Sequence, residues 1–444
     1  MKPDRGTLSW IEIVRLGLVQ ASLGAIVVLT TSTLNRVMVV ELMLPAMLPG
    51  ALVGLHYAVQ LSRPRWGHGS DKGGRRTPWI IAGMLVLALG GTLAAVATAL
   101  ASSSLVAGIA LSVFAFLLIG GGVGAAGTSL LALLATDVAP ERRAPAASIT
   151  WIMMIFGFAV TAGVAGGLLD PFSLTRLVLV TGGVCAAAFA LCTLAVWGVE
   201  REQRAAPSAA AQAAPNGGFR TALKEVWAEP KARVFTIFVF VSMLAYSSSD
   251  LILEPFTGVV FDLSVGQSTQ LAGMQHGGVL IGMIGVAILG AKLAGRGFGR
   301  RQGWVIGGCA ASSLALFALA AASLAGPGWP LAPTVVVLGL ANGAFAVAAI
   351  GAMMGLAGAD GAGREGVRIG LWGAAQAIAF GVGGFLGAAA IDAARAIFDD
   401  ASIAFAIVFA AEAVLFLVAA RLALGVEEHN PETDVMPSLA GGAQ

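Results

Sequence analysis

The residues that most suggest chemistry form a polar stretch at 67–76, GHGSDKGGRR, inside an apolar chain. Glycines beside a lysine can cradle a phosphate, but the P-loop spacing GxxxxGK[ST] is absent. A dinucleotide-binding fingerprint is also excluded, because Lys72 stands where the third glycine belongs and no strand precedes it. The stretch is therefore predicted to be a short polar turn.

Two polar clusters follow Ser/Thr runs, TTST in one case and SSS in the other. We expect them to lie at the far ends of two membrane helices, the second of which ends before a proline. There the groups either line the mouth of a cavity or form an interfacial salt bridge that holds a gate shut, for instance Arg36 with Glu254. Both interpretations remain open. The clusters are Asn35, Arg36 and Glu41 in the first, and Asp250 and Glu254 in the second.

Two histidines, His56 and His276, each stand alone in an apolar run. Ionisable residues within membrane segments are costly to bury and are functional candidates for that reason. A hydrogen bond between helices is the simpler interpretation of His56, whereas a packing role and a ligand role are equally compatible with His276. His68 and His429 are expected to be solvated.

No pattern predicts an enzyme. Asp137 and Glu141, in TDVAPERR, come nearest to a diphosphate-binding acidic motif, and their spacing is wrong. No Ser/His/Asp or Cys/His arrangement is placed for catalysis. The three cysteines, Cys185, Cys192 and Cys309, sit in apolar runs without metal-ligand spacing.

The composition is that of a membrane protein. The 444 residues are 57% hydrophobic and only 11% charged, with a mean hydropathy of +0.87. Soluble domains carry about 25% charged residues. Because a helix needs about 20 apolar residues to cross the bilayer, the sequence predicts about twelve spans, centred near residues 26, 53, 89, 119, 157, 187, 243, 279, 314, 345, 379 and 412.

The chain divides at a polar stretch rich in Ala, Pro, Gly and charge, residues 199–232. We interpret it as a cytoplasmic linker between a six-helix half at 1–198 and a second six-helix half at 233–426. Residues 427–444 are expected to form a flexible cytoplasmic tail.

The basic residues indicate an orientation. With both termini in the cytoplasm, 23 of the 26 Lys and Arg residues fall on the cytoplasmic side, and only Arg36, Arg176 and Arg395 fall opposite. This asymmetry is the positive-inside pattern. It supports the number of spans as well, since one span more or fewer would scramble it. The net charge of +2 gives no reason to expect a nucleic-acid partner.

The two halves repeat one another weakly. Arg143 precedes Trp151 by eight residues, as Arg364 precedes Trp372, and the pairs are offset by 221 residues. Asp170 and Asp392 are offset by 222, and His56 and His276 by 220. Two related six-helix halves are typical of major facilitator transporters.

The polar turn at 67–76 also resembles major facilitator transporters. Its fixed positions match the loop signature that major facilitator proteins carry between spans two and three. Glycines permit the tight reversal and arginines anchor the cytoplasmic side. The matching residues are Gly67, Asp71, Lys72, Gly74, Arg75 and Arg76. We therefore expect an all-α membrane protein with the major facilitator fold, built from twelve transmembrane helices in two pseudo-symmetric halves.

Longer segments resemble one family within this fold. GLHYAVQLSRPRWGHGSDKGGRRTPWI, SDLILEPFTGVVFDLSVGQSTQL and GLWGAAQAIAFGVGGFLG are similar to the PucC/LhaA, or bacteriochlorophyll delivery, family. The resemblance implies a light-harvesting assembly factor in the inner or intracytoplasmic membrane of a photosynthetic bacterium. It also implies bacteriochlorophyll or a late precursor as cargo, and light-harvesting apoproteins, pigment-synthesis enzymes or the insertion machinery as partners.

Under this resemblance several polar and aromatic residues become candidates for contact with pigment. His56 would be an axial ligand to the pigment magnesium, and no metal would be bound directly by the protein. A tryptophan face could stack on a tetrapyrrole, although helix packing is an equal interpretation. The candidates are His56, His276, Trp151, Trp372, Gln376 and Asn342.

The alternative is a proton-coupled exporter of a hydrophobic small molecule. Such a carrier needs a carboxylate deep in a span. The sequence suggests only Glu412, in span twelve, which disfavours the exporter.

Overall fold

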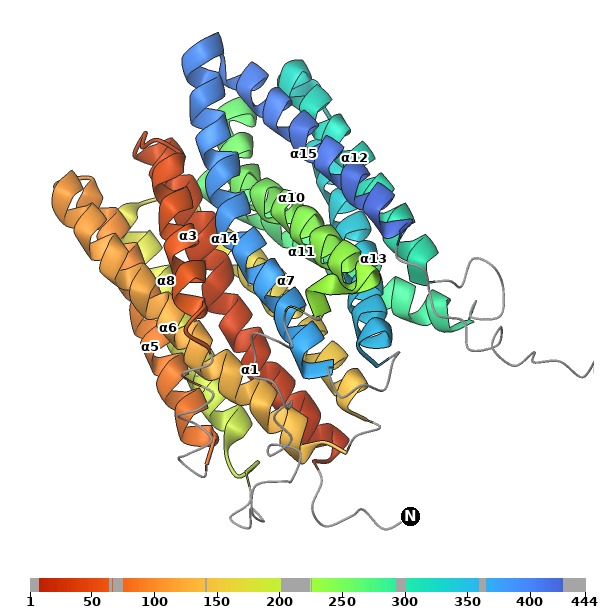
Figure 1. Cartoon of the computed structure of the whole chain (residues 1–444). Helices are drawn as coiled ribbons and strands as arrows, with labels where there is room; N and C mark the ends of the chain where they lie inside the picture. The colour runs from red at the N-terminus through yellow and green to blue at the C-terminus, as the bar shows by residue number, and fades with distance from the viewer. Residues whose placement is uncertain are drawn as a thin grey trace, which may run out of the picture.

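The computed structural model describes residues 8–63, 66, 75–139, 142–200, 224, 226–292, 301–358 and 365–425. These residues form helices and no strand, and the long helices run side by side as one elongated bundle (Figure 1). The first helix is continuous through four elements, α1 (Trp10–Val28), η1 (Leu29–Thr33), α2 (Leu34–Arg36) and η2 (Val37–Glu41). The others are α3 (Met47–Gln60), α5 (Thr77–Ala101), α6 (Leu105–Asp137), α7 (Arg143–Leu169), α8 (Leu174–Val196), α10 (Pro230–Phe261), α11 (Val265–Lys292), α12 (Arg301–Ala325), α13 (Leu331–Gly358), α14 (Glu365–Phe398) and α15 (Ala401–Ala423).

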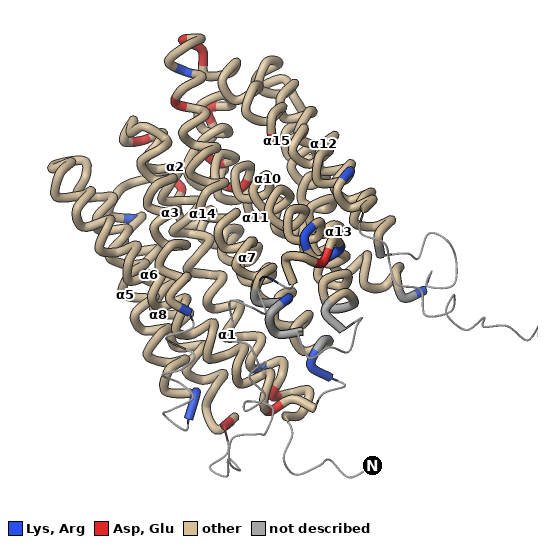
Figure 2. The backbone as a smooth tube through the Cα atoms, in the orientation of Figure 1, with Lys and Arg blue, Asp and Glu red and all other residues tan. Residues whose placement is uncertain are grey.

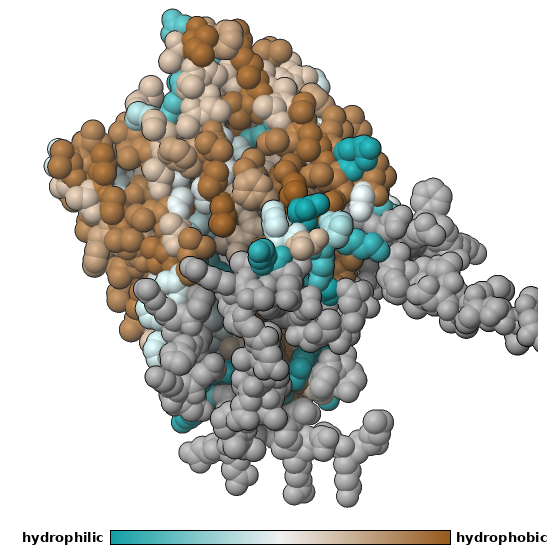
Figure 3. Space-filling model, viewed as in Figure 1, coloured by the Kyte–Doolittle hydropathy of each residue, from teal (hydrophilic) through white to brown (hydrophobic). Residues whose placement is uncertain are grey.

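The predicted spans are confirmed. Eleven helices in the described part of the chain are long and apolar enough to cross a membrane. The remaining long helix, α3, has 14 residues and lies at the position predicted for span two. Each predicted centre falls inside its helix. The face of the helix bundle seen in Figure 3 is largely apolar, and the charged residues lie mainly toward the helix ends (Figure 2).

We call the end of the bundle where α1 and α10 begin the inner end, and the end where η2 and α10 finish the outer end. Arg15 at the inner end donates to the carbonyl oxygen of Trp197 (2.5 Å), and the Arg76 amide there donates to Glu200. Arg36, Arg176 and Arg395 lie toward the outer end, as the predicted topology requires. Which end faces the cytoplasm stays a prediction.

Two large apolar clusters fill the bundle. One consists mostly of residues between Leu8 and Val199, and the other of residues between Phe235 and Ala423. They correspond to the N-terminal half, α1 to α8, and the C-terminal half, α10 to α15. Most of the predicted linker at 199–232 lies outside the described residues, so the exact domain boundaries stay a prediction; α10 begins within that range, at Pro230.

The halves meet closely along two helix pairs, α7 with α11 and α3 with α14. A Cβ at Gly166 would lie 2.7 Å from the carbonyl oxygen of Gly266, and one at Gly50 would lie 2.9 Å from the Cβ of Ala388. Glycine is needed there because any side chain would push the helices apart. Both contacts lie toward the outer end.

One predicted boundary is wrong. The second polar cluster was expected to end its helix before Pro255, yet α10 continues through that proline to Phe261. Asp250 and Glu254 therefore lie inside the helix. A proline is tolerated within a membrane helix when another group satisfies the backbone carbonyl that it leaves unpaired.

Candidate functional site

Residues from both halves form a hydrogen-bonded contact near the outer end. The carboxylate of Glu254, on α10, is only 1% exposed. It accepts hydrogen bonds from the hydroxyl of Ser32 on η1 (2.6 Å) and from that of Thr269 on α11 (3.1 Å). The Thr269 hydroxyl also contacts that of Thr33, at 3.3 Å. This network, which we call the outer latch, links the first helix to α10 and α11.

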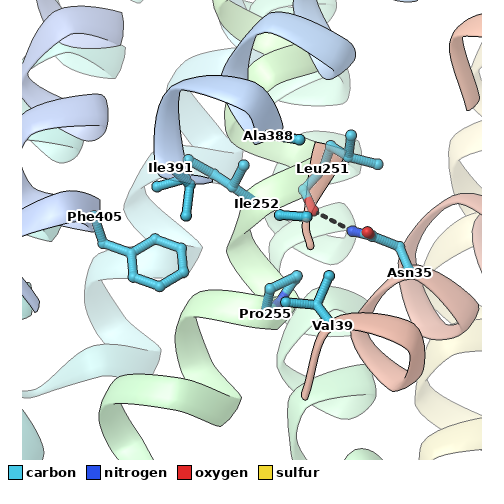
Figure 4. A pocket seen from close by; sticks show the side chains of 9 residues that line it. Asn35, Val39, Leu251, Ile252, Pro255, Ala388, Ile391 and Phe405 are labelled. Carbon is cyan, nitrogen blue, oxygen red and sulfur yellow. Dashed lines mark hydrogen bonds between the residues drawn. The ribbon is translucent and has the colours of Figure 1, made fainter. Parts of the chain in front are cut away.

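The side chain of Asn35 completes the hydrogen bonding of α10. Pro255 has no N–H, so the carbonyl of Leu251, four residues earlier, loses its helical partner. The Asn35 amide donates to that carbonyl oxygen at 2.6 Å (Figure 4). A side-chain amide of the N-terminal half thus supplies a hydrogen bond that a helix of the C-terminal half lacks. A small apolar pocket surrounds this bond, lined by Asn35, Val39, Ala46, Leu251, Ile252, Pro255, Ala388, Ile391 and Phe405.

The guanidinium of Arg36 also crosses between the halves. It is 2% exposed, binds the carboxylate of Glu41 at 2.5 Å and donates to the Leu263 carbonyl oxygen at 2.6 Å. The pairing suggested from sequence, Arg36 with Glu254, is therefore wrong. Glu41 lies five residues after Arg36 within the π-helical segment η2, where the i, i+5 spacing brings the two side chains together.

Two aspartates make equivalent contacts in the two halves. Asp170, just after α7, accepts from the Ser264 hydroxyl just before α11 (3.0 Å). Asp392, near the end of α14, accepts from the backbone amides of Ala46 and Met47 at the start of α3 (3.0 and 2.7 Å). The repeat seen in the sequence thus corresponds to symmetric contacts between the halves.

A second cluster lies deeper in the bundle. Nε2 of His276, on α11, is 3.8 Å from the carboxylate of Asp250 on α10. Phe158, on α7, packs edge-on against the imidazole with ring centroids 5.0 Å apart. Tyr57 and Tyr246 lie close enough to Asp250 to interact with it electrostatically. We call Asp250, His276 and these three aromatic residues the central cluster.

His56 occupies the corresponding place in the N-terminal half. It is 1% exposed, and its Nε2 lies 2.9 Å from the Gln60 amide nitrogen. Its Nδ1 has no hydrogen-bond partner among the described residues. A row of aromatic rings begins at His56 and runs through Tyr57, Phe380 and Tyr246, each ring in contact with the next. It joins His56 to the two tyrosines of the central cluster.

The other pigment candidates are dispersed. Trp372 is 1% exposed and packs on Phe235, and Asn342 is fully buried and accepts from the Ser312 hydroxyl. Among the described residues, the side-chain amide of Gln376 has a single hydrogen-bond partner, the Met243 sulfur at 3.9 Å. The structure brings none of these three to the histidines. Trp151 packs on the cluster of Ile155, Val279 and Met283, which Phe158 also contacts.

Most of the loop signature lies outside the described residues, namely Gly67, Asp71, Lys72 and Gly74. Arg75 is exposed. The Arg76 guanidinium donates to the Thr136 hydroxyl at 3.0 Å, and its backbone amide donates to Glu200. Sequence reasoning did not single out Glu200, whose carboxylate also caps the start of α5 at Thr77.

The carboxylates inside the spans are more numerous than the sequence suggested. Glu412, on α15, is 2% exposed and accepts from Ser248 on α10. Asp250 and Glu254 join it as span residues because α10 is longer than expected. The expectation that Glu412 is the single deep carboxylate is therefore wrong, and so is the argument against an exporter that rested on it.

A two-halved bundle of long apolar helices, joined by polar contacts at one end, has the architecture of the major facilitator transporters. Solved transporter structures agree. The chain aligns with a bacterial homologue of the human lysosomal transporter Spinster, in an inward-facing and occupied conformation, at a TM-score of 0.68, covering 95% of this chain and 97% of that one. It aligns with the nucleoside transporter NupG at 0.64, covering 94% and 100%. The identities, 15% and 14%, show the fold alone.

Sequence relatives are more specific. Residues 33–430 match the family model described as PUCC protein. The chain is 55% identical to the "Bacteriochlorophyll synthase 44.5 kDa chain" of Rhodobacter capsulatus, over 98% of this chain and 100% of the relative. It is 32% identical to "Protein PucC" of Cereibacter sphaeroides, over 84% and 81%. The chain belongs to the PucC family.

Proposed function

We propose that the protein is an assembly factor that binds bacteriochlorophyll, or a late precursor, and delivers it to light-harvesting apoproteins. The observation that carries the proposal is membership of the PucC family, with a full-length relative named for bacteriochlorophyll. The multi-pass helical bundle supports a site of action in the bilayer, and the distribution of Lys and Arg favours termini in the cytoplasm.

The proposed role is not enzymatic, although one relative is called a synthase. The fold is shared with transporters, which bind and move a cargo between two halves. The polar groups of the outer latch, and with them Asn35 and Arg36, are engaged in hydrogen bonds between the halves. We infer that these contacts close the outer end of a cavity between the two halves.

An absorption spectrum tests whether the protein binds bacteriochlorophyll. The protein is purified in mild detergent from pigment-replete cells, and co-purifying polypeptides are identified. We expect a bacteriochlorophyll-type spectrum and light-harvesting polypeptides or pigment-synthesis enzymes in the preparation. A colourless preparation without these polypeptides would contradict the proposal.

His56 is the candidate ligand for the pigment magnesium. Its Nδ1 is unpartnered among the described residues and its ring begins the aromatic row toward the central cluster. Neutral imidazole is a good axial ligand, because one nitrogen can bind metal while the other is held by a hydrogen bond. In the structure the Gln60 amide nitrogen donates to Nε2, so the neutral ring carries its hydrogen on Nδ1. Binding of magnesium by Nδ1 therefore requires the Gln60 amide to turn, so that its oxygen accepts from Nε2–H.

We predict that His56→Phe lowers pigment occupancy without loss of folded protein, because phenylalanine preserves the ring contact but has no ligating nitrogen. Pigment per protein is measured by absorption after size-exclusion chromatography. His68→Phe, the same substitution in the polar turn, serves as control and should keep full occupancy. Unchanged occupancy in His56→Phe would assign His56 to helix packing.

The second candidate function is a proton-coupled exporter of a hydrophobic molecule. It is favoured by the three carboxylates inside the spans, Asp250, Glu254 and Glu412. In proteoliposomes an exporter should move a hydrophobic dye in response to a pH gradient, and neutralising one of these carboxylates should abolish the flux. Pigment binding without such flux would exclude this candidate.

A further inference from the structure

We propose that Asp250 and His276 form a proton-binding site in the interior of the bundle, and that its occupancy by a proton biases the contact between the two halves. The inference is independent of which molecule the protein carries. It rests on the tautomer of His276, on the place of Asp250, and on what the two side chains touch.

The hydrogen bonds of His276 determine which nitrogen carries hydrogen. Nδ1 lies 2.8 Å from the carbonyl oxygen of Ala272. A carbonyl oxygen can only accept, so Nδ1 is the N–H nitrogen. In the neutral ring, Nε2 is therefore a bare acceptor. It is buried, has no hydrogen-bond partner in the described part of the chain, and faces a carboxylate oxygen of Asp250 at 3.8 Å.

Two electron-rich atoms facing each other at this distance repel unless a proton sits on one of them. The proton is either on Nε2, giving an imidazolium beside a carboxylate, or on Asp250, giving a neutral acid beside a neutral ring. In both forms the pair has no net charge. Releasing the proton to water leaves a net charge of −1, which is costly within the bilayer.

The pair is buried in depth but open on one side. Asp250 lies eleven residues before the end of α10 and His276 eleven residues after the start of α11. At 1.5 Å per residue both are about 17 Å from the outer end. The Asp250 side chain is nevertheless 27% exposed, and it interacts with Tyr57 of the opposite half. Part of the carboxylate is therefore accessible for the exchange of a proton.

Few other titratable groups compete with the pair. Tyr246 and Glu254 on α10 and Tyr57 on α3 interact electrostatically with Asp250. Among their described residues, α7, α13 and η1 carry no Asp, Glu, Lys, His or Tyr, and the one arginine is Arg143 at the start of α7. Most charged groups on the remaining neighbouring helices have partners of their own. These are Arg36 with Glu41, Arg368 with Glu229, Glu412 with Ser248, and Asp392 with the start of α3. Arg395 and Arg421 lie in the last turns of their helices.

The pair lies next to the contact between the halves. The His276 ring packs on Phe158 of α7, in the N-terminal half. Asp250 is one helical turn from Glu254, the carboxylate at the centre of the outer latch. A change in the charge of the pair thus acts directly on two points where the halves meet.

Nitrogen NMR and infrared spectroscopy test the site. Protein labelled with ¹⁵N-histidine is titrated with pH in detergent, and the His276 signal is assigned by its loss in His276→Gln. If the proton is on the imidazole, Asp250→Asn should change the His276 nitrogen signals from those of the imidazolium to those of the neutral ring at the same pH, because the stabilising carboxylate is gone. If the proton is on the carboxyl group, Asp250→Asn should remove a carboxylic acid band.

Glu412→Gln is the matched control, since it neutralises a buried carboxylate on another helix. It should leave the His276 signal unchanged. The site is refuted if Asp250→Asn changes neither the His276 signal nor the carboxylic acid band. If Asp250→Asn does not fold, His276→Gln is the test: without the ring, a carboxylic acid band of Asp250 should appear or shift, and an unchanged infrared spectrum would refute the site.

Distance measurements test the coupling. Spin labels are placed at Ser103 and Gly328, two exposed positions in outer turns of the two halves. We expect the distance distribution between them to depend on pH in the otherwise unchanged protein and to lose that dependence in Asp250→Asn. A distribution that is independent of pH in both proteins would overturn the coupling.

Discussion

At the scale of single residues, Asn35 and Pro255 form a compensating pair between the two halves. The proline removes an N–H from α10, and the amide of Asn35 donates to the carbonyl thus left free. In lipid no water replaces a missing partner, so an unpaired carbonyl is costly. The pair explains why a proline is tolerated in the middle of the outer contact.

This compensation predicts a specific non-additivity. Asn35→Leu should destabilise the protein by about 1–3 kcal/mol, the cost of orphaning a buried acceptor. In a Pro255→Ala background the alanine N–H can bond to the Leu251 carbonyl, so the same substitution should cost clearly less. The free energy of unfolding is measured in mixed micelles for all four proteins of this double-mutant cycle.

Gln376→Leu provides the control for this cycle, because it removes an amide whose hydrogen bond within the described residues is a long one to a sulfur atom. Its effect on the free energy of unfolding should be the same in the Pro255→Ala background as in the protein that keeps the proline. Equal costs of Asn35→Leu in the two backgrounds would mean that the amide acts independently of the proline.

The sequence located the polar groups of this contact but not their partners. Asn35, Arg36 and Glu254 stand out because polar residues are rare in apolar runs. Their pairing depends on the two π-helical segments, η1 and η2, which rotate the side chains relative to an α-helix. That rotation has no signature in hydropathy. The TTST run contains Ser32 but does not identify Glu254 as its partner, and Thr269 carries too little polarity to be distinguished from ordinary span residues.

At the scale of the helices, glycines set the distance between α11 and α13. A Cβ at Gly282 would clash with the carbonyl oxygen of Leu340, whereas a Cβ at Gly285, three residues along the same helix, meets nothing within 4 Å. Close backbone approach of this kind is a main source of helix association in membranes, where no hydrophobic effect drives it.

We therefore predict that Gly282→Ala destabilises the protein by about 1–3 kcal/mol, the usual cost of overpacking. Gly285→Ala should be neutral, or stabilising by up to about 1 kcal/mol from helix propensity. Thermal unfolding of the two purified variants makes the comparison, since both carry the same substitution in one helix. Equal effects would show that the α11–α13 contact does not depend on the glycine.

Helix positions were predictable to a greater degree than helix ends. Hydropathy located all of the span centres, because about 20 apolar residues in a row have few alternatives to crossing the bilayer. The end of α10 was misplaced because Pro255 was interpreted by the rule for soluble helices. The correct end depends on Asn35, which lies 220 residues earlier in the chain.

At the scale of the whole molecule, the polar contacts between the halves gather at the outer end. Ser32–Glu254, Asn35–Leu251, Arg36–Leu263 and the contacts of Asp170 and Asp392 all lie there. An interface that never opens could be apolar, since apolar packing avoids the cost of burying polar groups. The retention of buried Arg36 and Glu254 therefore favours a contact that forms and breaks as the protein works.

A disulfide across this contact tests whether it must open. The Cβ of a cysteine at Gly50 would lie 2.9 Å from the Cβ of residue 388, and disulfides need about 3.8 Å, a difference that a small shift of α3 accommodates. We expect Gly50→Cys with Ala388→Cys to form the bond without added oxidant, because the predicted topology places the outer end in the oxidising periplasm.

Light-harvesting complexes should then accumulate to a lower level than in cells with either single variant, which controls for the substitutions themselves. Absorption spectra of the membranes give the amount of complex, and gel mobility with and without reductant gives the fraction of protein cross-linked. Normal accumulation with the protein fully cross-linked would mean that delivery proceeds with the outer end closed. A disulfide that forms only with added oxidant would contradict the predicted orientation.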